Sequence, residues 1–177
     1  MNKFLLAVHV LAAIVAVGPV TVAASMFPPS ARKALAEPGD AQALSTVRVL
    51  HRICRLYATV GVAVPVFGFA TAKNMGVLGD TWLIVSIALT ALAAVVLAAL
   101  VLPRQTALME GIEGMEGVAE RIGEGVGAGG EGAADAGVSR VGPRDTARLA
   151  MFTGLFNLLW ATVTILMIVR PGSTTGA

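Results

Sequence analysis

The sequence predicts an all-α integral membrane protein whose fold is a four-helix transmembrane bundle. Hydrophobic residues make up 56% of the 177 residues and charged residues only 14%, a balance that water-soluble domains do not have. The apolar residues are also concentrated in four blocks, each close to the ~20 residues that a helix needs to cross a ~30 Å hydrocarbon core. Because lipid offers backbone N–H and C=O groups no hydrogen-bond partner, each block is expected to form a helix.

The four blocks divide the chain into spans and polar connections. In chain order, the predicted segments are a first span (1–27), a cytoplasmic connection with the start of the second helix (28–52), a second span (53–72), a short external loop (73–81), a third span (82–102), an acidic Gly-rich cytoplasmic linker (103–148), a fourth span (149–169) and an external tail (170–177).

Two adjacent prolines mark the predicted end of the first helix. Pro28 and Pro29 are helix-ending signals, and a short separate helix is expected from Ser30 to Ala36. No helix breaker occurs from Ala41 onward in this connection, so the second helix is predicted to begin several residues before it enters lipid.

Three arginines fall on one face of that second helix. Arg48, Arg52 and Arg55 stand at i, i+4 and i+7, and we expect them at the level of the lipid headgroups. Basic side chains that extend to the headgroups and retain the topology explain this pattern. The alternative is that they bind a specific anionic lipid or a partner.

The long linker opens with an amphipathic stretch. Its apolar residues recur at helical spacing and its glutamates lie opposite them; the two sets are Leu108, Ile112, Met115, Ala119 and Ile122, and Glu110, Glu113, Glu116, Glu120 and Glu124. This stretch is predicted either to continue the third helix or to lie against the bundle. Residues 123–142 are mostly glycine, alanine and acidic residues, which predicts a flexible linker.

The distribution of basic residues predicts the orientation in a bacterial plasma membrane. Lysine and arginine near the ends of spans are retained on the cytoplasmic side. Ten of them lie in the two long connections or, for Arg55, just inside the adjoining end of the second span, against three elsewhere, namely Lys3, Lys73 and Arg170. The sequence therefore predicts that both termini are outside and that both long connections are cytoplasmic.

A cleaved signal peptide is the competing interpretation of the first block. Lys3 precedes an apolar run, and Val22-Ala23-Ala24 suits cleavage after small residues. A mature chain would then begin near Ser25 and would export an arginine-rich segment unless the remaining helices inverted. The uncleaved first span agrees better with the rule for basic residues.

Few polar side chains fall within the predicted spans, where such groups usually face the interior of a bundle. The predicted interior set is His9, Ser86, Asn157 and Thr164. Depth along the spans places Ser86 and Thr164 near the level of His9, whereas Asn157 is expected to hydrogen-bond across a helix contact. His51 lies near the opposite membrane face, so the two histidines are not expected to share one cofactor.

The first helix resembles a known group of proteins. Residues 4–13, followed by Val17-Gly18, and the segment from Leu50-His51-Arg52 through Gly61 and Gly68 resemble an uncharacterised bacterial family of predicted integral membrane proteins (DUF2269-like). More distantly, they are similar to copper-resistance CopD-like proteins and to membrane-bound protoporphyrinogen oxidases. The resemblance implies a four-helix membrane protein.

The resemblance also implies a role for His9. In the haem-biosynthetic members the histidine of the first helix binds haem, which nominates His9 as a ligand of haem b. Those members also use a lysine in a later helix, and the third span here has none. The tryptophan that usually precedes the first-helix glycine is Val17 in this sequence. Oxidase activity is therefore not carried over.

The sequence predicts no catalytic constellation and no metal-ligand cluster, and a net charge of +2 does not favour nucleic acid as a partner. We expect an accessory or assembly component of a membrane complex, which contacts the lipid bilayer and either a membrane protein partner or further copies of itself. Enzymatic activity is not predicted. The alternatives are a haem-binding or redox protein that uses His9, and a small solute permease.

Overall fold

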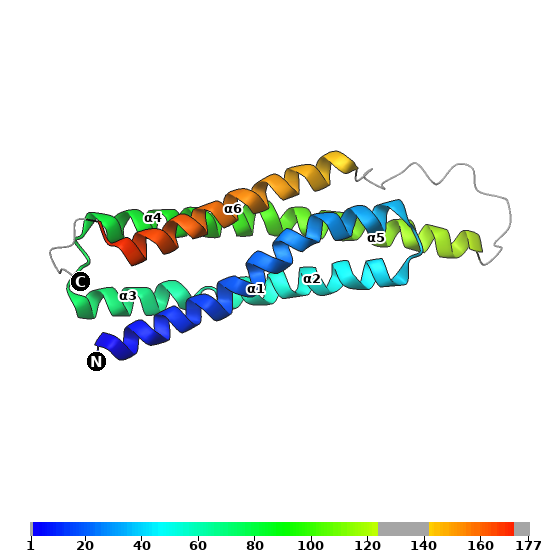
Figure 1. Cartoon of the computed structure of the whole chain (residues 1–177). Coiled ribbons are helices and arrows are strands. Elements are labelled where there is room, and N and C mark those ends of the chain that lie inside the picture. Colours follow the sequence, from blue (N-terminus) through cyan, green and yellow to red (C-terminus); the bar gives the residue numbers. More distant parts are fainter. Residues whose placement is uncertain (1, 124–141, 172–177) are drawn as a thin grey trace.

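The computed structural model describes residues 2–123 and 142–171. Within these residues, four helices are long and apolar enough to cross a membrane: Lys3–Ala36, Ala41–Met75, Thr81–Val118 and Pro143–Val169. They lie side by side as an elongated bundle (Figure 1). The predicted all-α membrane bundle is confirmed. The central part of the predicted flexible linker and most of the predicted tail lie outside the described residues.

Two of the four spans consist of more than one helical element. In chain order the elements are α1 (Asn2–Ala36), α2 (Ala41–Val60), α3 (Ala63–Met75), α4 (Thr81–Val95), the π-helix η1 (Val96–Val101), α5 (Leu102–Gly123) and α6 (Pro143–Val169). The second span is α2 followed by α3, and the third is α4, η1 and α5 without a gap.

The prediction that Pro28 and Pro29 end the first helix is wrong. Both prolines lie inside α1, which runs on to Ala36. A proline removes one helical hydrogen bond, which costs about 3 kcal/mol in a helix interior, and packing overrides that cost here. Phe27 and Ala31 on this part of α1 are fully buried, with 0% exposure, so continuing the helix keeps their face against the bundle.

The second helix begins at Ala41, several residues before the predicted span, as the sequence predicts. The Asp40 carboxylate caps α2, because its Oδ1 accepts hydrogen bonds from the backbone N–H groups of Gln42 at 2.9 Å and Ala43 at 3.1 Å. The helix is interrupted at Gly61, four residues before Pro65. Proline has no N–H to donate to the Gly61 carbonyl, and the Val64 N–H donates to it instead at 3.1 Å.

The third span contains a π-helical segment that sequence periodicity does not reveal. In η1 the Leu102 N–H donates to the Leu97 carbonyl, five residues back. The helix then continues as α5 to Gly123. The amphipathic stretch therefore continues the third helix, which is one of the two predicted arrangements, and the linker does not begin at residue 103.

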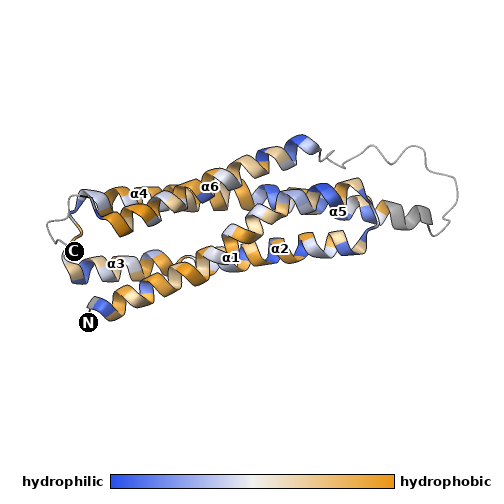
Figure 2. Ribbon diagram, viewed as in Figure 1, coloured by the Kyte–Doolittle hydropathy of each residue, from blue (hydrophilic) through white to orange (hydrophobic). Residues whose placement is uncertain are grey.

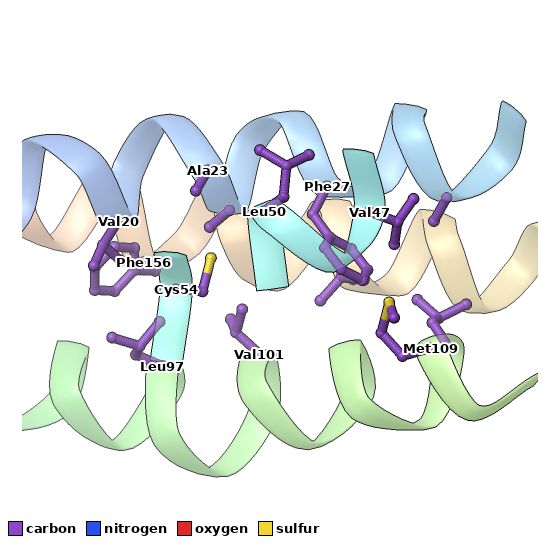
Figure 3. Close-up of a cluster of buried hydrophobic side chains, with 14 of the residues drawn as sticks. Val20, Ala23, Phe27, Val47, Leu50, Cys54, Leu97, Val101, Met109 and Phe156 are labelled. Carbon is purple, nitrogen blue, oxygen red and sulfur yellow. The ribbon is translucent and has the colours of Figure 1, made fainter. Parts of the chain in front are cut away.

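The core consists of interlocking small and medium-sized side chains at the middle of the bundle. Figure 3 shows Phe27 and Ala23 of α1 facing Cys54 of α2 and Val101 of η1, all buried. The outer surface carries large apolar side chains, such as Ile168 at 76% exposure. An outer surface of this kind is suited to lipid, and the polar residues gather at one end of the bundle (Figure 2).

This polar end extends beyond the thickness of a membrane. The third span is 38 residues long, or ~57 Å at 1.5 Å per residue, against a hydrocarbon core of ~30 Å. We define the polar end as residues 30–48, 104–118 and 143–148. Side chains join its helices: Arg32 Nε donates to Thr146 Oγ1 at 3.1 Å, and Arg48 pairs with Glu113 at 2.9 Å.

Candidate functional site

His9 joins the first and second spans at the end opposite the polar end. Its imidazole is 8% exposed, and its Nδ1 lies 3.1 Å from the backbone carbonyl oxygen of Val64 in the first turn of α3. The ring lies against the backbone at Gly68, where an added Cβ would be 3.0 Å from His9 Cε1. Gly68 therefore allows α1 and α3 to approach closely around the imidazole.

The hydrogen bond of His9 defines which ring nitrogen is available for chemistry. A carbonyl can only accept, so Nδ1 carries the proton and Nε2 is left as an acceptor or ligand atom in the neutral ring. Histidines that bind metals usually donate their other ring N–H in this way. The described residues contain no group of three His, Cys, Asp or Glu side chains that could hold a metal ion.

Ser86 and Thr164 do not join His9 in a hydrogen-bonded group. Ser86 is fully buried, and its hydroxyl donates to the Trp82 carbonyl of its own helix at 2.8 Å. Thr164 is exposed and donates to Trp160 within α6 at 2.9 Å. The structure corrects the interior assignment of Thr164, because depth along a span sets the level of a residue and leaves its face undetermined.

Asn157 makes a contact between helices, as its position predicts. Its Nδ2 donates to Ser25 Oγ of α1 at 3.0 Å, and Ser25 in turn donates to the Thr21 carbonyl at 2.7 Å. Two buried atoms beside this contact, Asn157 Oδ1 and Thr153 Oγ1, have no hydrogen-bond partner in the described part of the chain. The contact therefore joins α6 to α1, and the two polar atoms beside it could each form a further hydrogen bond.

A second buried polar group, which the sequence did not indicate, lies near the polar end. His51 Nδ1 donates to Gln105 Oε1 at 3.3 Å, and Gln105 Nε2 donates to Cys54 Sγ at 3.5 Å. Gln105 has 0% exposure, although its position falls in the predicted linker. One sequence pattern could have indicated this burial: Gln105 continues a series of apolar residues spaced by four, Ala93, Leu97 and Val101. The structure shows that all three are buried.

A groove of about 480 Å³ opens beside this group. We call it the arginine groove, and it is lined by Arg48, His51, Arg52, Arg55, Leu56, Thr59 and Met109. Six of these residues belong to α2 and Met109 belongs to α5. The three predicted arginines therefore lie together along one groove between two spans.

Comparison with known proteins gives the family. Residues 3–121 match the model of the family described as predicted integral membrane protein (DUF2269). The chain belongs to this family. The match covers the first three spans, so His9, Gly68, the arginine groove and Gln105 all lie in the family region. No curated protein and no solved structure matches the chain.

Membership of this family confirms the resemblance stated from the first helix and the Leu50-to-Gly68 segment. α6 and its Asn157 lie beyond the matched residues. The polar contacts inside the family region include those of His9 with Val64, and of Gln105 with His51 and Cys54. The similarity to haem-binding relatives stays a prediction.

Proposed function

We propose that this protein is a non-catalytic accessory or assembly component of a membrane complex, and that it holds its partner through the polar end. The observation that supports this proposal is the extension of the folded bundle beyond the hydrocarbon core. A protein that acted only within lipid would not require spans of 35 and 38 residues when ~20 are enough.

The polar end is a packed structure with a surface suited to a protein partner. Val47 of α2 is fully buried there, and Leu108 and Ile112 of α5 are each 2% exposed. The opposite side of α5 presents acidic side chains to solvent, with Glu110 exposed and Glu113 bound to Arg48. A rigid helical surface with charged residues favours specific and oriented association.

The same proposal includes an orientation in the bacterial plasma membrane. Six of the thirteen lysine and arginine residues lie at the polar end, and Arg52 and Arg55 follow it on α2. Basic residues near spans are retained in the cytoplasm, so we place the polar end in the cytoplasm and both termini outside. The partner would then meet the protein at the cytoplasmic surface or within the membrane.

The test is the size of the protein after extraction in mild detergent from the cells that make it. Wild-type protein should migrate in an assembly larger than the single chain, and Glu110→Lys with Glu116→Lys should release it. Lys73→Glu, at the opposite end of the bundle, is the control and should leave the assembly intact. A strictly monomeric wild-type protein, or equal loss in the control, would contradict the proposal.

One observation favours a second candidate function, a haem-binding or redox protein. The Val64 carbonyl fixes Nδ1 of His9 and leaves Nε2 as a ligand atom; haem bound there would supply one-electron chemistry. Protein from haem-replete cells should then show a Soret band that disappears in His9→Ala and persists in His51→Ala. Colourless wild-type protein would rule this function out.

A further inference from the structure

We infer that the arginine groove binds the phosphate headgroup of an anionic membrane lipid. This inference goes beyond the proposed accessory function, because it concerns a different ligand, although the groove shares Arg48 and Met109 with the polar end. It stands on three features of the groove: the geometry of its arginines, its charge, and its continuity with the lipid-facing surface.

The geometry places several guanidinium groups within reach of one headgroup. Arg48, Arg52 and Arg55 follow one face of α2 over about 10 Å of helix rise, and all three line the groove. Guanidinium groups bind phosphate oxygens through paired N–H donors. A volume of about 480 Å³ is in the range of small-ligand sites.

The groove carries an excess of positive charge. Arg48 pairs with Glu113 of α5 at 2.9 Å, whereas Arg52 and Arg55 form no salt bridge with any residue that the structure describes. Three guanidinium groups against one carboxylate leave two positive charges. A headgroup phosphate provides negative charge where the protein does not.

The groove also continues onto the surface that faces lipid. Leu56 lines it and is 58% exposed, and Val60 one turn further is 42% exposed. A phosphate held by the arginines would therefore place its acyl chains along the apolar side of α2. A free phosphate ion would leave that apolar surface unused, so we assign the site to a lipid. Basic pockets between spans are known to bind such headgroups.

His51, which lines the groove, is held in position by a buried side chain of the neighbouring helix α5. His51 donates to Gln105 at 3.3 Å, and Gln105 is fully buried with its amide on Cys54. The position of the His51 ring thus depends on side chains that do not themselves face the groove. This arrangement prepares the site before the lipid arrives, which reduces the cost of ordering on binding.

The experiment measures lipid retention by the intact purified protein. Full-length protein in detergent is mixed with phosphatidylglycerol, with phosphatidylcholine, or with inorganic phosphate alone, and bound molecules are counted by native mass spectrometry. We expect selective retention of phosphatidylglycerol. The double variant Arg52→Gln with Arg55→Gln should weaken this binding at least about tenfold, since it removes two charge-assisted phosphate contacts.

The matched control removes the same charge at the same end. Arg144 and Arg148 of α6 are exposed and lie outside the groove, so Arg144→Gln with Arg148→Gln should retain the lipid. Arg52→Lys with Arg55→Lys should bind with intermediate affinity, because charge remains and paired donors are lost. A thermal unfolding curve for each variant separates loss of binding from loss of folding.

Three results would overturn the inference. Equal retention of phosphatidylglycerol and phosphatidylcholine would show that charge is not recognised. Equal weakening in the groove variant and in the control would show that only net charge matters. Inorganic phosphate bound as tightly as the lipid would assign the groove to a soluble anion.

Discussion

At Gly68 the absence of a side chain allows the imidazole of His9 to lie against the backbone of α3. A Cβ at this position would be 3.0 Å from His9 Cε1 and 3.4 Å from Nδ1. The ring would have to move away, and its hydrogen bond to the Val64 carbonyl would lengthen or break. Both residues stand out in the sequence, but their pairing across 59 positions depends on how two helices cross.

The variant Gly68→Ala should therefore destabilise the protein. We expect a loss of about 1–3 kcal/mol in the free energy of unfolding, which is typical of overpacking in a well-packed site, measured by thermal or detergent-induced unfolding. Gly154→Ala on α6 is the control, because no atom lies within 4 Å of its added Cβ. Equal stability of the two variants would show that Gly68 is not a point of close approach.

The cap of α2 should make local stability depend on pH. The Ala43 N–H, which donates to the Asp40 carboxylate, holds the pKa of this carboxyl below its ordinary value. A lowered pKa in the folded state means that the stabilisation is complete above the ordinary pKa and is lost as the pH falls through the folded value. Acid should therefore weaken the start of α2.

Hydrogen exchange of the capped amides measures this effect. In the wild type, protection of the Gln42 and Ala43 amides should fall as the pH drops below about 4. In Asp40→Asn, whose amide oxygen still caps the helix and does not ionise, protection should no longer depend on pH in this window. A decline of the same size in both proteins would refute the role of the carboxylate.

Among the elements, η1 determines which face of α5 meets the bundle. Each residue of a π-helical turn rotates through a smaller angle around the helix axis than a residue of an α-helix. Buried residues therefore recur every four positions from Ala93 to Gln105. In a regular α-helix with 3.6 residues per turn, that series would rotate away from the core. The π-segment is thus what turns Gln105 toward His51 and Cys54.

Cysteine cross-linking can test this register. Cys54 is the only cysteine in the chain, and the Gln105 side chain reaches its sulfur at 3.5 Å, so a short bifunctional thiol cross-linker should join Gln105→Cys to Cys54. Thr106→Cys, the exposed neighbour, should not be joined. Deleting Ala98 from η1 should reduce the cross-link at residue 105 strongly, since α5 would rotate by about 100°. Undiminished cross-linking after the deletion would argue against the π-segment.

Local sequence rules account for some elements better than for others. The Asp40 cap and the long apolar blocks were predictable, because capping and hydrophobicity act over a few residues or within one helix. The continuation of α1 through Pro28 and Pro29, and the burial of Gln105, were not, because each depends on packing against distant helices. For the same reason His9 was identified as a polar interior residue, whereas its partner Val64 was not.

For the whole molecule, the arrangement of basic residues predicts the direction of insertion. The polar end contains six basic residues, Arg32, Lys33, Arg48, Arg104, Arg144 and Arg148, while the opposite end has three, Lys3, Lys73 and Arg170. Retention of positive charge in the cytoplasm acts on all four helices at once. One orientation should therefore dominate.

Reporter fusions check this orientation. Alkaline phosphatase, which is active only outside the cytoplasm, should be active when fused after residue 177 and inactive when inserted in the 124–141 segment. A green fluorescent protein fusion at the same two places should give the opposite pattern and serves as the control. Phosphatase activity in the segment, with none at the C-terminus, would invert the proposed topology.

The start of α1 and the end of α6 lie at the same end of the bundle (Figure 1). A hydrophilic peptide joining the last residue of one copy to the first residue of another would thus remain in a single aqueous compartment. A gene that encodes two copies joined by such a peptide should therefore yield a polypeptide in which each copy inserts with the same orientation as the single chain. Such a molecule would fix stoichiometry at two and allow a substitution to be placed in one unit alone.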